Sequence, residues 1–406
     1  MIVFIPRRHH KYFILFIILL FTAANFLFAQ ERADSITITP AVHTIQHSPG
    51  FSTGNFITHF GFTPEEGLIL GSSFRVRSGH QPNKSLTEIS ATHAFSTRAW
   101  RWRIYHEMNA VFGNNNDLIT DIDIRIPNNT TYFYGYGMNS VYDKSQPEHL
   151  KYYRARYDLA DVYIDLRHHF SPTVALTIGA NYEYYEMDGS NKFNARRFIS
   201  QTGMGPTKNG LTAKGIFNLQ KYLGYVISLN VDTRNSRLFP EKGVQWKTTI
   251  RQLYQLKSSR YDPTMINSDL SFYLPLLPNR LTFANRIGIG TTLGRFSYQH
   301  AQYLGNNDDL RGYYKERWAG NTKVYNQAEV RWRAGSLQTR LTKGPWGLLF
   351  FTDAGLVWTP ADTNHHPAIG YGGGLWFAPG SKLLITVNYA VSREESIPFL
   401  LMGWRF

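Results

Sequence analysis

Apolar and polar residues alternate along much of this chain, and the alternation predicts β-strands. Between Leu223 and Asp232, every second position is apolar or aromatic: Leu223, Tyr225, Ile227, Leu229 and Val231. The same spacing returns near the end of the chain, at Leu383, Ile385, Val387, Tyr389 and Val391. Because successive side chains of a strand point to opposite faces, each segment has one apolar face and one more polar face.

Candidate strands of this kind number about 16. They are Gly54–Thr63, Gly67–Ser78, Leu86–Phe95, Trp100–Phe112, Leu118–Ile126, Tyr152–His169, Val174–Met187, Tyr222–Asp232, Val244–Tyr254, Met265–Leu274, Leu281–Leu293, Lys323–Arg333, Gly347–Trp358, Ile369–Phe377, Lys382–Val391 and Pro398–Phe406. An even number of antiparallel strands leaves both ends of the series on one side of the sheet. The longer connections Asn128–Leu150, Asp188–Lys214 and Gly294–Thr322 then fall mostly on the opposite side.

The first 29 residues have the pattern of a secretory signal peptide. Arg7, Arg8 and Lys11 precede the apolar run Tyr12–Phe28, which ends at Ala29 before a polar residue. A charged start, an apolar stretch and a small residue at its end predict cleavage near Ala29. The alternative is a retained membrane anchor, for which this run is at the lower limit of length. The absence of cysteine excludes a lipoprotein anchor and disulfide bonds.

The composition favours a membrane barrel over a soluble sandwich. Aromatic residues make up 15% of the chain, including 25 Tyr and 27 Phe, yet the mean hydropathy is slightly negative. A barrel combines both properties because its outward residues are apolar or aromatic and its inward residues are polar. A soluble β-sandwich also alternates, but it does not account for the signal peptide or for the apolar last strand.

We therefore predict an all-β fold, a transmembrane antiparallel β-barrel of about 16 strands. The barrel is expected at residues 52–406, after a signal peptide at residues 1–29 and a short periplasmic segment at residues 30–51.

One of the predicted loops contains a candidate for a buried ion pair. Its centre is Leu310-Arg311-Gly312-Tyr313, and an alternating strand follows. Arg311 carries five N–H donors and a permanent charge, so in a buried position it needs carboxylates in more than one direction. Two acids follow on the next two predicted strands, Glu329 and, among apolar neighbours, Asp353. The alternative is an exposed loop arginine.

Four segments in order resemble a known family. DTRNSRLFPEKG at residues 232–243 is followed by LRGY at 310–313, by AEVRW at 328–332 and by DAGLVW at 353–358. They are similar to the BamA, TamA and FhaC type of outer-membrane barrel, the bacterial surface antigen superfamily, and the resemblance extends from about Ser52 to the last residue. It implies a bacterial outer-membrane protein in which the first segment is a periplasmic turn.

The resemblance also implies that the long extracellular loop folds back into the barrel lumen, where Arg311 meets Glu329 and Asp353. We name this set the loop lock: Leu310, Arg311, Gly312, Tyr313, Glu329 and Asp353. Barrels of the BamA type carry periplasmic POTRA domains, which are far longer than residues 30–51. We therefore expect the barrel alone, without a POTRA domain and without the phosphoesterase or lipase domain that some related barrels carry.

We find no catalytic, cofactor-binding or metal-binding motif, and we expect neither an enzyme nor a cofactor. The pairs His168-His169 and His365-His366 are candidate metal ligands. Neighbouring residues of a strand point to opposite faces, however, so such a pair cannot hold one ion there. The more ordinary interpretation is a set of turn or interface histidines.

Three glycines in IGYGGGLWF are spaced two apart: Gly370, Gly372 and Gly374. They do not form a phosphate loop, because no lysine or helix follows. Their spacing places them on one face of a strand, which we interpret as a lumen face with room for the folded loop.

The chain is basic, with 43 Lys and Arg against 29 Asp and Glu and a formal charge of +14. Nucleic acid is not an expected partner of an exported barrel. Five cations of one predicted outer loop are placed to meet lipopolysaccharide phosphates: Lys192, Arg196, Arg197, Lys208 and Lys214. The alternative is a set of solvated loop charges.

Three classes of function agree with such a barrel. The first, implied by the resemblance, is to aid assembly or translocation of outer-membrane or secreted proteins. Its partners would be membrane lipid, client polypeptides and a periplasmic protein. The second is a passive pore for small solutes. The third is an outer-membrane hydrolase, but we find no Ser-His-Asn arrangement on a strand face. We favour the first class.

The favoured function depends on a weak seam between the first and last strands, whose edge pairs with a client. The candidate seam residues are Thr58, His59, Leu400, Met402 and Phe406. The last strand begins with Pro398, which cannot donate a ladder hydrogen bond, so the pairing is expected to be short. Phe406 and the apolar residues at alternate positions before it are similar to the C-terminal signal of outer-membrane barrels.

Overall fold

The structure is a computed structural model that describes residues 50–53, 55–63, 66–79, 83–145, 149–187, 219–257, 261–305, 308–338, 343–360, 366–379 and 384–402. The predicted signal peptide and residues 30–49 lie outside the described residues. So do Phe406 and the five loop cations expected to meet lipopolysaccharide.

The described chain is almost entirely β-strand. The strands are β1 (Gly50–Thr53), β2 (Phe56–Thr63), β3 (Gly67–Gly79), β4 (Lys84–Ala94), β5 (Ala99–Met108), β6 (Asn116–Tyr132), β7 (Arg154–Ser171), β8 (Val174–Met187), β9 (Gln220–Asp232), β10 (Gly243–Gln255), β11 (Thr264–Leu277), β12 (Leu281–Leu293), β13 (Gln302–Leu304), β14 (Trp318–Gly320), β15 (Thr322–Gln338), β16 (Lys343–Trp358), β17 (Ala368–Phe377), β18 (Ile385–Ser392) and β19 (Ser396–Met402). Two short helices accompany them, α2 (His149–Tyr152) and the 3-10 helix η1 (Tyr298–His300). No helix of the described residues is long and apolar enough to cross a membrane.

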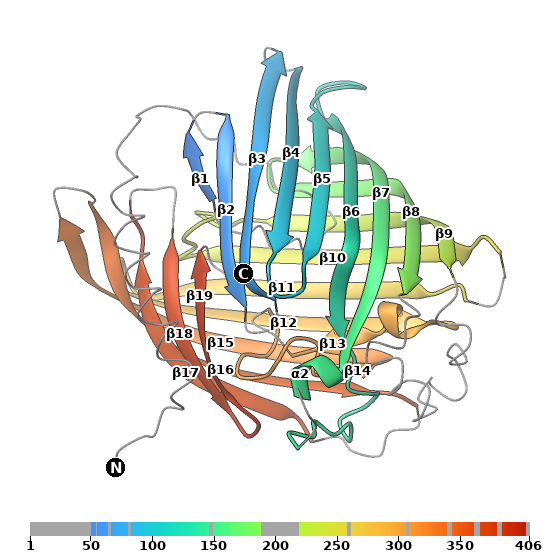
Figure 1. Cartoon of the computed structure of the whole chain (residues 1–406). Helices are drawn as coiled ribbons and strands as arrows, with labels where there is room; N and C mark the ends of the chain where they lie inside the picture. The colour runs from blue at the N-terminus through green and yellow to red at the C-terminus, as the bar shows by residue number, and fades with distance from the viewer. Residues whose placement is uncertain are drawn as a thin grey trace.

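The strands form one curved antiparallel sheet in which each strand pairs with the next along the chain (Figure 1). This sheet has 17 strands: the four-residue β1, and the longer strands β2 to β12 and β15 to β19. Strands β13 and β14 form a separate two-stranded sheet. The predicted fold class, an antiparallel β-barrel of about 16 strands, is confirmed.

The two ends of the meander meet where β19 lies next to β2 (Figure 1, red and blue). Ladders of paired residues join all consecutive strands from β1 to β12, β12 to β15, and β15 through to β19. The pairing ladders of the described residues thus account for every junction of the sheet except this one, where β19 and β2 are neighbours.

The two faces of the strands differ as the alternation predicts. On β9, Leu223 and Tyr225 are exposed on the outside, whereas Tyr222 and Val226 are fully buried inside. On β18, Val387 and Tyr389 are exposed, while the residues that alternate with them are buried: Thr386, Asn388 and Ala390. An apolar outer face and a more polar inner face are what a barrel in lipid requires.

The inner face carries charges that are paired across neighbouring strands. Arg103 on β5 forms two hydrogen bonds with Asp121 on β6, at 2.8 and 2.7 Å. Arg251 on β10 reaches both Glu183 on β8 and Asp161 on β7, each at 2.9 Å. Buried charges need such partners, so these pairs also fix how the walls of the barrel face one another.

The structure corrects several of the predicted boundaries, among them the ends of β5, at Met108 instead of Phe112, and β15, at Gln338 instead of Arg333. The sheet begins at Gly50 instead of residue 52, because Gly50–Thr53 pair with Phe56–His59 as a short hairpin. Strand β6 continues past the predicted Ile126 to Tyr132, because Asn129–Tyr132 pair with β7, and the predicted loop from Asn128 is correspondingly shorter. The last strand begins at Ser396, two residues before the predicted start.

If the outer face contacts lipid, an arginine there should destabilise the barrel according to its depth. Ile287 is 44% exposed in the middle of β12, and Leu277 is 56% exposed at the end of β11. We expect Ile287→Arg to cost about 2–4 kcal/mol of folding free energy and Leu277→Arg about 0–1 kcal/mol. Urea titration in lipid vesicles, followed by the heat-modifiable gel shift, measures both. Equal effects of the two substitutions would contradict a lipid-facing belt.

Candidate functional site

The connection between β12 and β15 folds back against the inner wall of the barrel. Its short strands β13 and β14 contact β15 and β16 and lie within the curve of the main sheet (Figure 1). Its buried apolar residues Leu304, Leu310 and Trp318 pack with inward-facing residues of the wall, among them Tyr325 and Val357. The loop is therefore held inside the barrel by burial of apolar surface as well as by charge.

Arg311 lies in the middle of this loop and is 1% exposed. Its Nε and Nη2 donate to the two carboxylate oxygens of Asp353, both at 2.6 Å, and its Nη1 donates to Glu329 at 2.8 Å. The backbone N–H of Arg311 donates to Asp353 as well, at 3.0 Å. The structure thus brings together the three charged residues of the loop lock, from the loop, β15 and β16.

The guanidinium of Arg311 is also stacked on an aromatic ring. Phe351 lies on β16 two residues before Asp353, and its ring centroid is 3.6 Å from Arg311 Cζ. Burial alone would lower the pKa of Arg311, but Asp353 and Glu329 outweigh this effect and hold the pKa above its ordinary value. The arginine is therefore charged and fully partnered in the folded barrel.

The other residues of the loop lock fit closely against the last strands. Gly312 has a φ of 91°, and a Cβ there would lie 3.1 Å from the Cβ of Ser392. Its carbonyl oxygen accepts a hydrogen bond from Ser392 Oγ at 2.7 Å, at the end of β18. The Tyr313 hydroxyl donates to the carbonyl of Ile369 at 3.1 Å, on β17. Leu310 is fully buried.

The glycine face of β17 leaves the space that this loop occupies. A Cβ at Gly370 would lie 1.9 Å from the carbonyl oxygen of Arg311, and one at Gly372 would lie 2.7 Å from the Phe351 ring. The residues between them, such as Tyr371, are exposed on the outside. The predicted lumen face of these glycines is confirmed.

Glu329 joins Arg311 to a second buried arginine. Its Oε1 accepts from Arg331 Nε at 2.7 Å, while its Oε2 accepts from Arg311. Arg331 Nη1 in turn lies 3.4 Å from the carbonyl oxygen of Pro240, in the turn between β9 and β10. In an antiparallel meander this turn is at the opposite end of the barrel from the loop. A continuous series of polar contacts therefore runs from the loop to the far end of the lumen.

The turn between β9 and β10 (residues 233–242) itself packs onto the inner wall. Leu238 and Phe239 contact an apolar cluster that includes Leu349, Trp376 and Phe399, and the rings of Phe239 and Trp376 are 4.7 Å apart. This is the turn that the resemblance predicts to be periplasmic. It covers part of the lumen at its own end, as the loop does at the other.

Further contacts of the loop are not predicted by the sequence. Arg317 donates to both oxygens of Glu394 at 2.7 Å, in the turn between β18 and β19, and to the carbonyl of Ser140 at 2.8 Å. On the opposite wall, His300 Nε2 lies 2.8 Å from Glu183 Oε1 on β8. The loop therefore connects walls that are far apart in the sheet.

The predicted seam residues lie at the two ends of the series of strands. Thr58 and His59 are on β2, where they pair with β1 on one side and β3 on the other. Leu400 and Met402 are on β19, paired with Val387 and Ile385 of β18. Phe406 is outside the described residues. The structure thus places the two groups on neighbouring strands, with β1 beside part of the β2 edge.

The histidine pair His168-His169 on β7 lies apart from this site. His168 Nδ1 is 2.8 Å from Asn116 Oδ1, and its neighbour His169 contacts Asp117 at 2.8 Å instead. His365 lies outside the described residues. Within the described part of the chain, no three residues of the types His, Cys, Asp and Glu are placed to hold a metal ion.

Two residues of the site that were not predicted, Phe351 and Arg331, could have been found from their spacing in the sequence. Phe351 and Arg331 each lie two positions from a predicted acid, Asp353 and Glu329 respectively, and so share its face of the strand. The pair Arg317 and Glu394 is 77 residues apart and has no local signal of this kind.

The sequence matches a known protein family, and the fold is similar to solved structures of outer-membrane proteins. The family model of the Omp85 superfamily domain matches residues 104–396. The fold is similar to the crystal structure of BamA from Haemophilus ducreyi lacking POTRA domains 1–3, with a TM-score of 0.60 and 12% identity over 85% of this chain and 69% of that chain. It is also similar to CdiB from Escherichia coli, with a TM-score of 0.57 and 11% identity over 87% of this chain and 62% of that chain. No curated protein matches the sequence.

Removal of Arg311 should release the loop without unfolding the barrel. Arg311→Ala leaves Asp353 and Glu329 buried without their counter-charge, which costs on the order of 3–5 kcal/mol. We expect proteinase K to cleave the loop in intact cells and the thermal unfolding temperature to fall. The matched control is the exposed Arg237, for which Arg237→Ala should cost about 1 kcal/mol or less. Unchanged protease resistance of Arg311→Ala would show that the ion pairs do not hold the loop.

The glycine face provides a second test of the same packing. Gly370→Ala places a methyl group against the backbone of Arg311 and should displace the loop. Gly373→Ala is the control on the opposite face of β17, where the nearest atom to a Cβ is 3.0 Å away. We expect loop cleavage by proteinase K only for Gly370→Ala. The same protease pattern in both variants would argue against a reserved space at Gly370.

Proposed function

The chain belongs to the Omp85 superfamily, and we propose on this basis that it aids the insertion or translocation of outer-membrane or secreted polypeptides. Barrels of this family are transporters or insertases rather than enzymes. Membership of the family also indicates that this chain lies in the bacterial outer membrane. The BamA and CdiB structures are remote in sequence, and the chain spans only part of their length, so they support the fold alone.

The occupied lumen is the observation that carries the proposal. The loop enters from one end through Arg311, and the turn between β9 and β10 packs inside the other end through Phe239. A passive pore conducts through a wide, water-filled lumen, whereas here two segments pack against its inner wall from opposite ends. This arrangement favours a polypeptide route along the wall of the barrel over a route through its centre.

The junction of β19 with β2 is the proposed place of contact with a client. β19 has seven residues, and Pro398 within it has no N–H to donate. The short β1 pairs with Phe56–His59 of β2 and leaves the rest of that edge beyond its reach. A strand edge with unpaired backbone groups accepts an added strand from another chain. We assign Leu400, Met402 and Phe406 of the last strand to this seam, together with Thr58 and His59 of β2, which are covered by the four-residue β1 and face a client only when β1 detaches.

The proposed partners follow from this assignment. A client polypeptide would pair with the seam, and a separate periplasmic protein would deliver it. Membrane lipid would contact the exposed apolar belt that includes Leu223 and Tyr225. The cations between Lys192 and Lys214 remain proposed contacts for lipopolysaccharide phosphates.

Closing the seam covalently tests the proposal, and the absence of cysteine makes the test clean. One cysteine is introduced by Phe60→Cys, two positions from Thr58 and beyond the residues of β2 that pair with β1, and a second in turn by Leu400→Cys, Leu401→Cys or Met402→Cys. A disulfide forms only where the two Cα atoms come within about 7 Å. In the variant that links, we expect oxidation to stop the assembly of outer-membrane proteins in cells and a reductant to restore it.

Ion conductance of the same variants in planar bilayers separates this function from a pore. Each single-cysteine variant under oxidation is the control for nonspecific damage. We expect conductance to be the same in the linked and reduced forms. Normal client assembly by the linked protein would remove lateral opening from the mechanism and leave the passive pore as the better assignment.

A further inference from the structure

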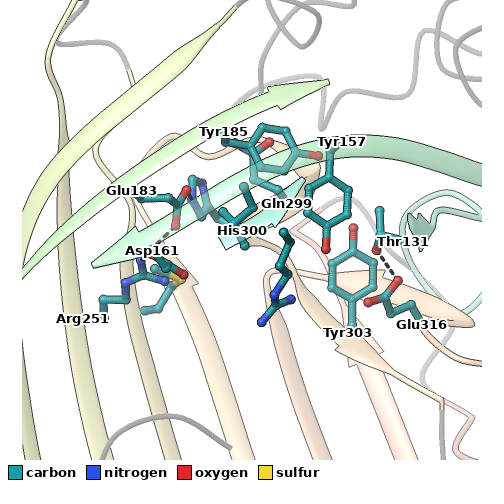
Figure 2. A pocket seen from close by; sticks show the side chains of 13 residues that line it. Thr131, Tyr157, Asp161, Glu183, Tyr185, Arg251, Gln299, His300, Tyr303 and Glu316 are labelled. Carbon is teal, nitrogen blue, oxygen red and sulfur yellow. Dashed lines mark hydrogen bonds and ion pairs between the residues drawn. The ribbon is translucent and has the colours of Figure 1, made fainter. Parts of the chain in front are cut away.

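A cavity of about 240 Å³ lies between the loop and the inner wall of the barrel, away from the loop lock. Its walls come from β6, β7, β8, β10 and β11 on one side and from η1, β13 and the loop on the other (Figure 2). Pockets for drug-sized ligands measure roughly 300–1,000 Å³, so this cavity has room for one small unit only.

The charges that line the cavity, apart from Glu316, already have charged partners within the protein. Arg251 is paired with Asp161 and Glu183, and His300 with Glu183. Arg125 donates through Nε and Nη2 to Asp123, at 3.1 and 2.8 Å. A charged ligand would have to break one of these pairs, which is costly in a partly desolvated site. The paired charges therefore favour a neutral ligand.

Hydrogen-bonding capacity nevertheless remains around the cavity. Nδ1 of His300, a residue that is 4% exposed, has no hydrogen-bond partner within the described chain. Glu316 uses Oε2 for the Thr131 hydroxyl and the Tyr132 N–H, so its Oε1 takes part in neither bond, and Arg125 and Tyr157 add a guanidinium and a hydroxyl to the lining. These atoms supply both donors and acceptors, which is what a ligand with several hydroxyl groups requires.

Aromatic rings provide the apolar part of the lining. Tyr157 is stacked on Tyr185, with ring centroids 5.1 Å apart and planes at 19°. Figure 2 shows Tyr157 and Tyr303 on one side of the lining and Glu183, Arg251 and His300 on the other. A flat ring face beside several polar groups suits a molecule that has a C–H face and a rim of hydroxyls.

From these features we propose that the cavity binds one neutral sugar ring, either a free monosaccharide or the end of a glycan. Its C–H face lies against the Tyr157 ring. Its hydroxyls bond to Glu316 Oε1, Arg125 Nη1, the Tyr157 hydroxyl and His300 Nδ1. The proposal is independent of polypeptide insertion, because it uses neither the seam nor the loop lock.

The test is calorimetric titration of the full barrel, purified in a detergent without a sugar headgroup. The probes are D-glucose, D-galactose, maltotriose and the charged comparator glucose 6-phosphate. We expect saturable one-to-one binding of at least one neutral sugar and weaker binding of the phosphate. Tighter binding of maltotriose than of glucose assigns the site to a glycan end, and the reverse assigns it to a free sugar; either result supports the proposal.

Variants of Tyr157 test whether the sugar binds in this cavity. Tyr157→Phe keeps the stacked ring and removes one neutral hydrogen bond, so we expect affinity to fall roughly two- to tenfold. Tyr157→Ala removes the ring face and should weaken binding further. Tyr254→Phe, on the outer face of β10, is the control and should bind like the unaltered protein. Absence of binding by every neutral sugar, tighter binding of glucose 6-phosphate, or equal binding by both Tyr157 variants and the unaltered protein would overturn the proposal.

Discussion

A guanidinium that is buried inside a barrel has to be neutralised where it lies, and this requirement organises the lumen. Arg311 satisfies it with Asp353 and Glu329, on two adjacent strands. The arrangement is possible only if the loop backbone comes within contact of β17, and there the chain carries glycine at position 370. The ion pair, the stacked Phe351 and the glycine face therefore depend on one another, because all three are needed to hold Arg311 at this place.

The same charge links the two ends of the molecule. Glu329 is shared by Arg311 and Arg331, and Arg331 extends to the turn that carries Phe239. The lumen is thus occupied by two segments that meet through a single acidic side chain of β15. In a protein proposed to act on polypeptides at its seam, this interior supports the inner wall and also contacts the C-terminal hairpin, through Phe399 and Ser392.

The sequence predicts the strands well wherever one face is apolar and the other polar, because that contrast comes from the barrel itself. The ranges Val174–Met187 and Leu281–Leu293 agree with β8 and β12. The alternation does not predict the short β1 or the last residues of β6. They are strands because a neighbour pairs with them, and their own residues show no alternation.

The candidate site divides in the same way. The pairing of Arg311 with Glu329 and Asp353 could be predicted from the sequence, because a buried charge requires a partner and the next strands contain few acids. The pair Arg317 and Glu394 and the sugar-sized cavity depend on how the loop packs against distant strands, and no local sequence pattern predicts that packing.

The hydrogen bond from Ser392 to Gly312 connects the end of β18 to the loop. It joins the C-terminal hairpin to the loop, so a displacement of the loop removes a contact of the last two strands as well as the loop lock.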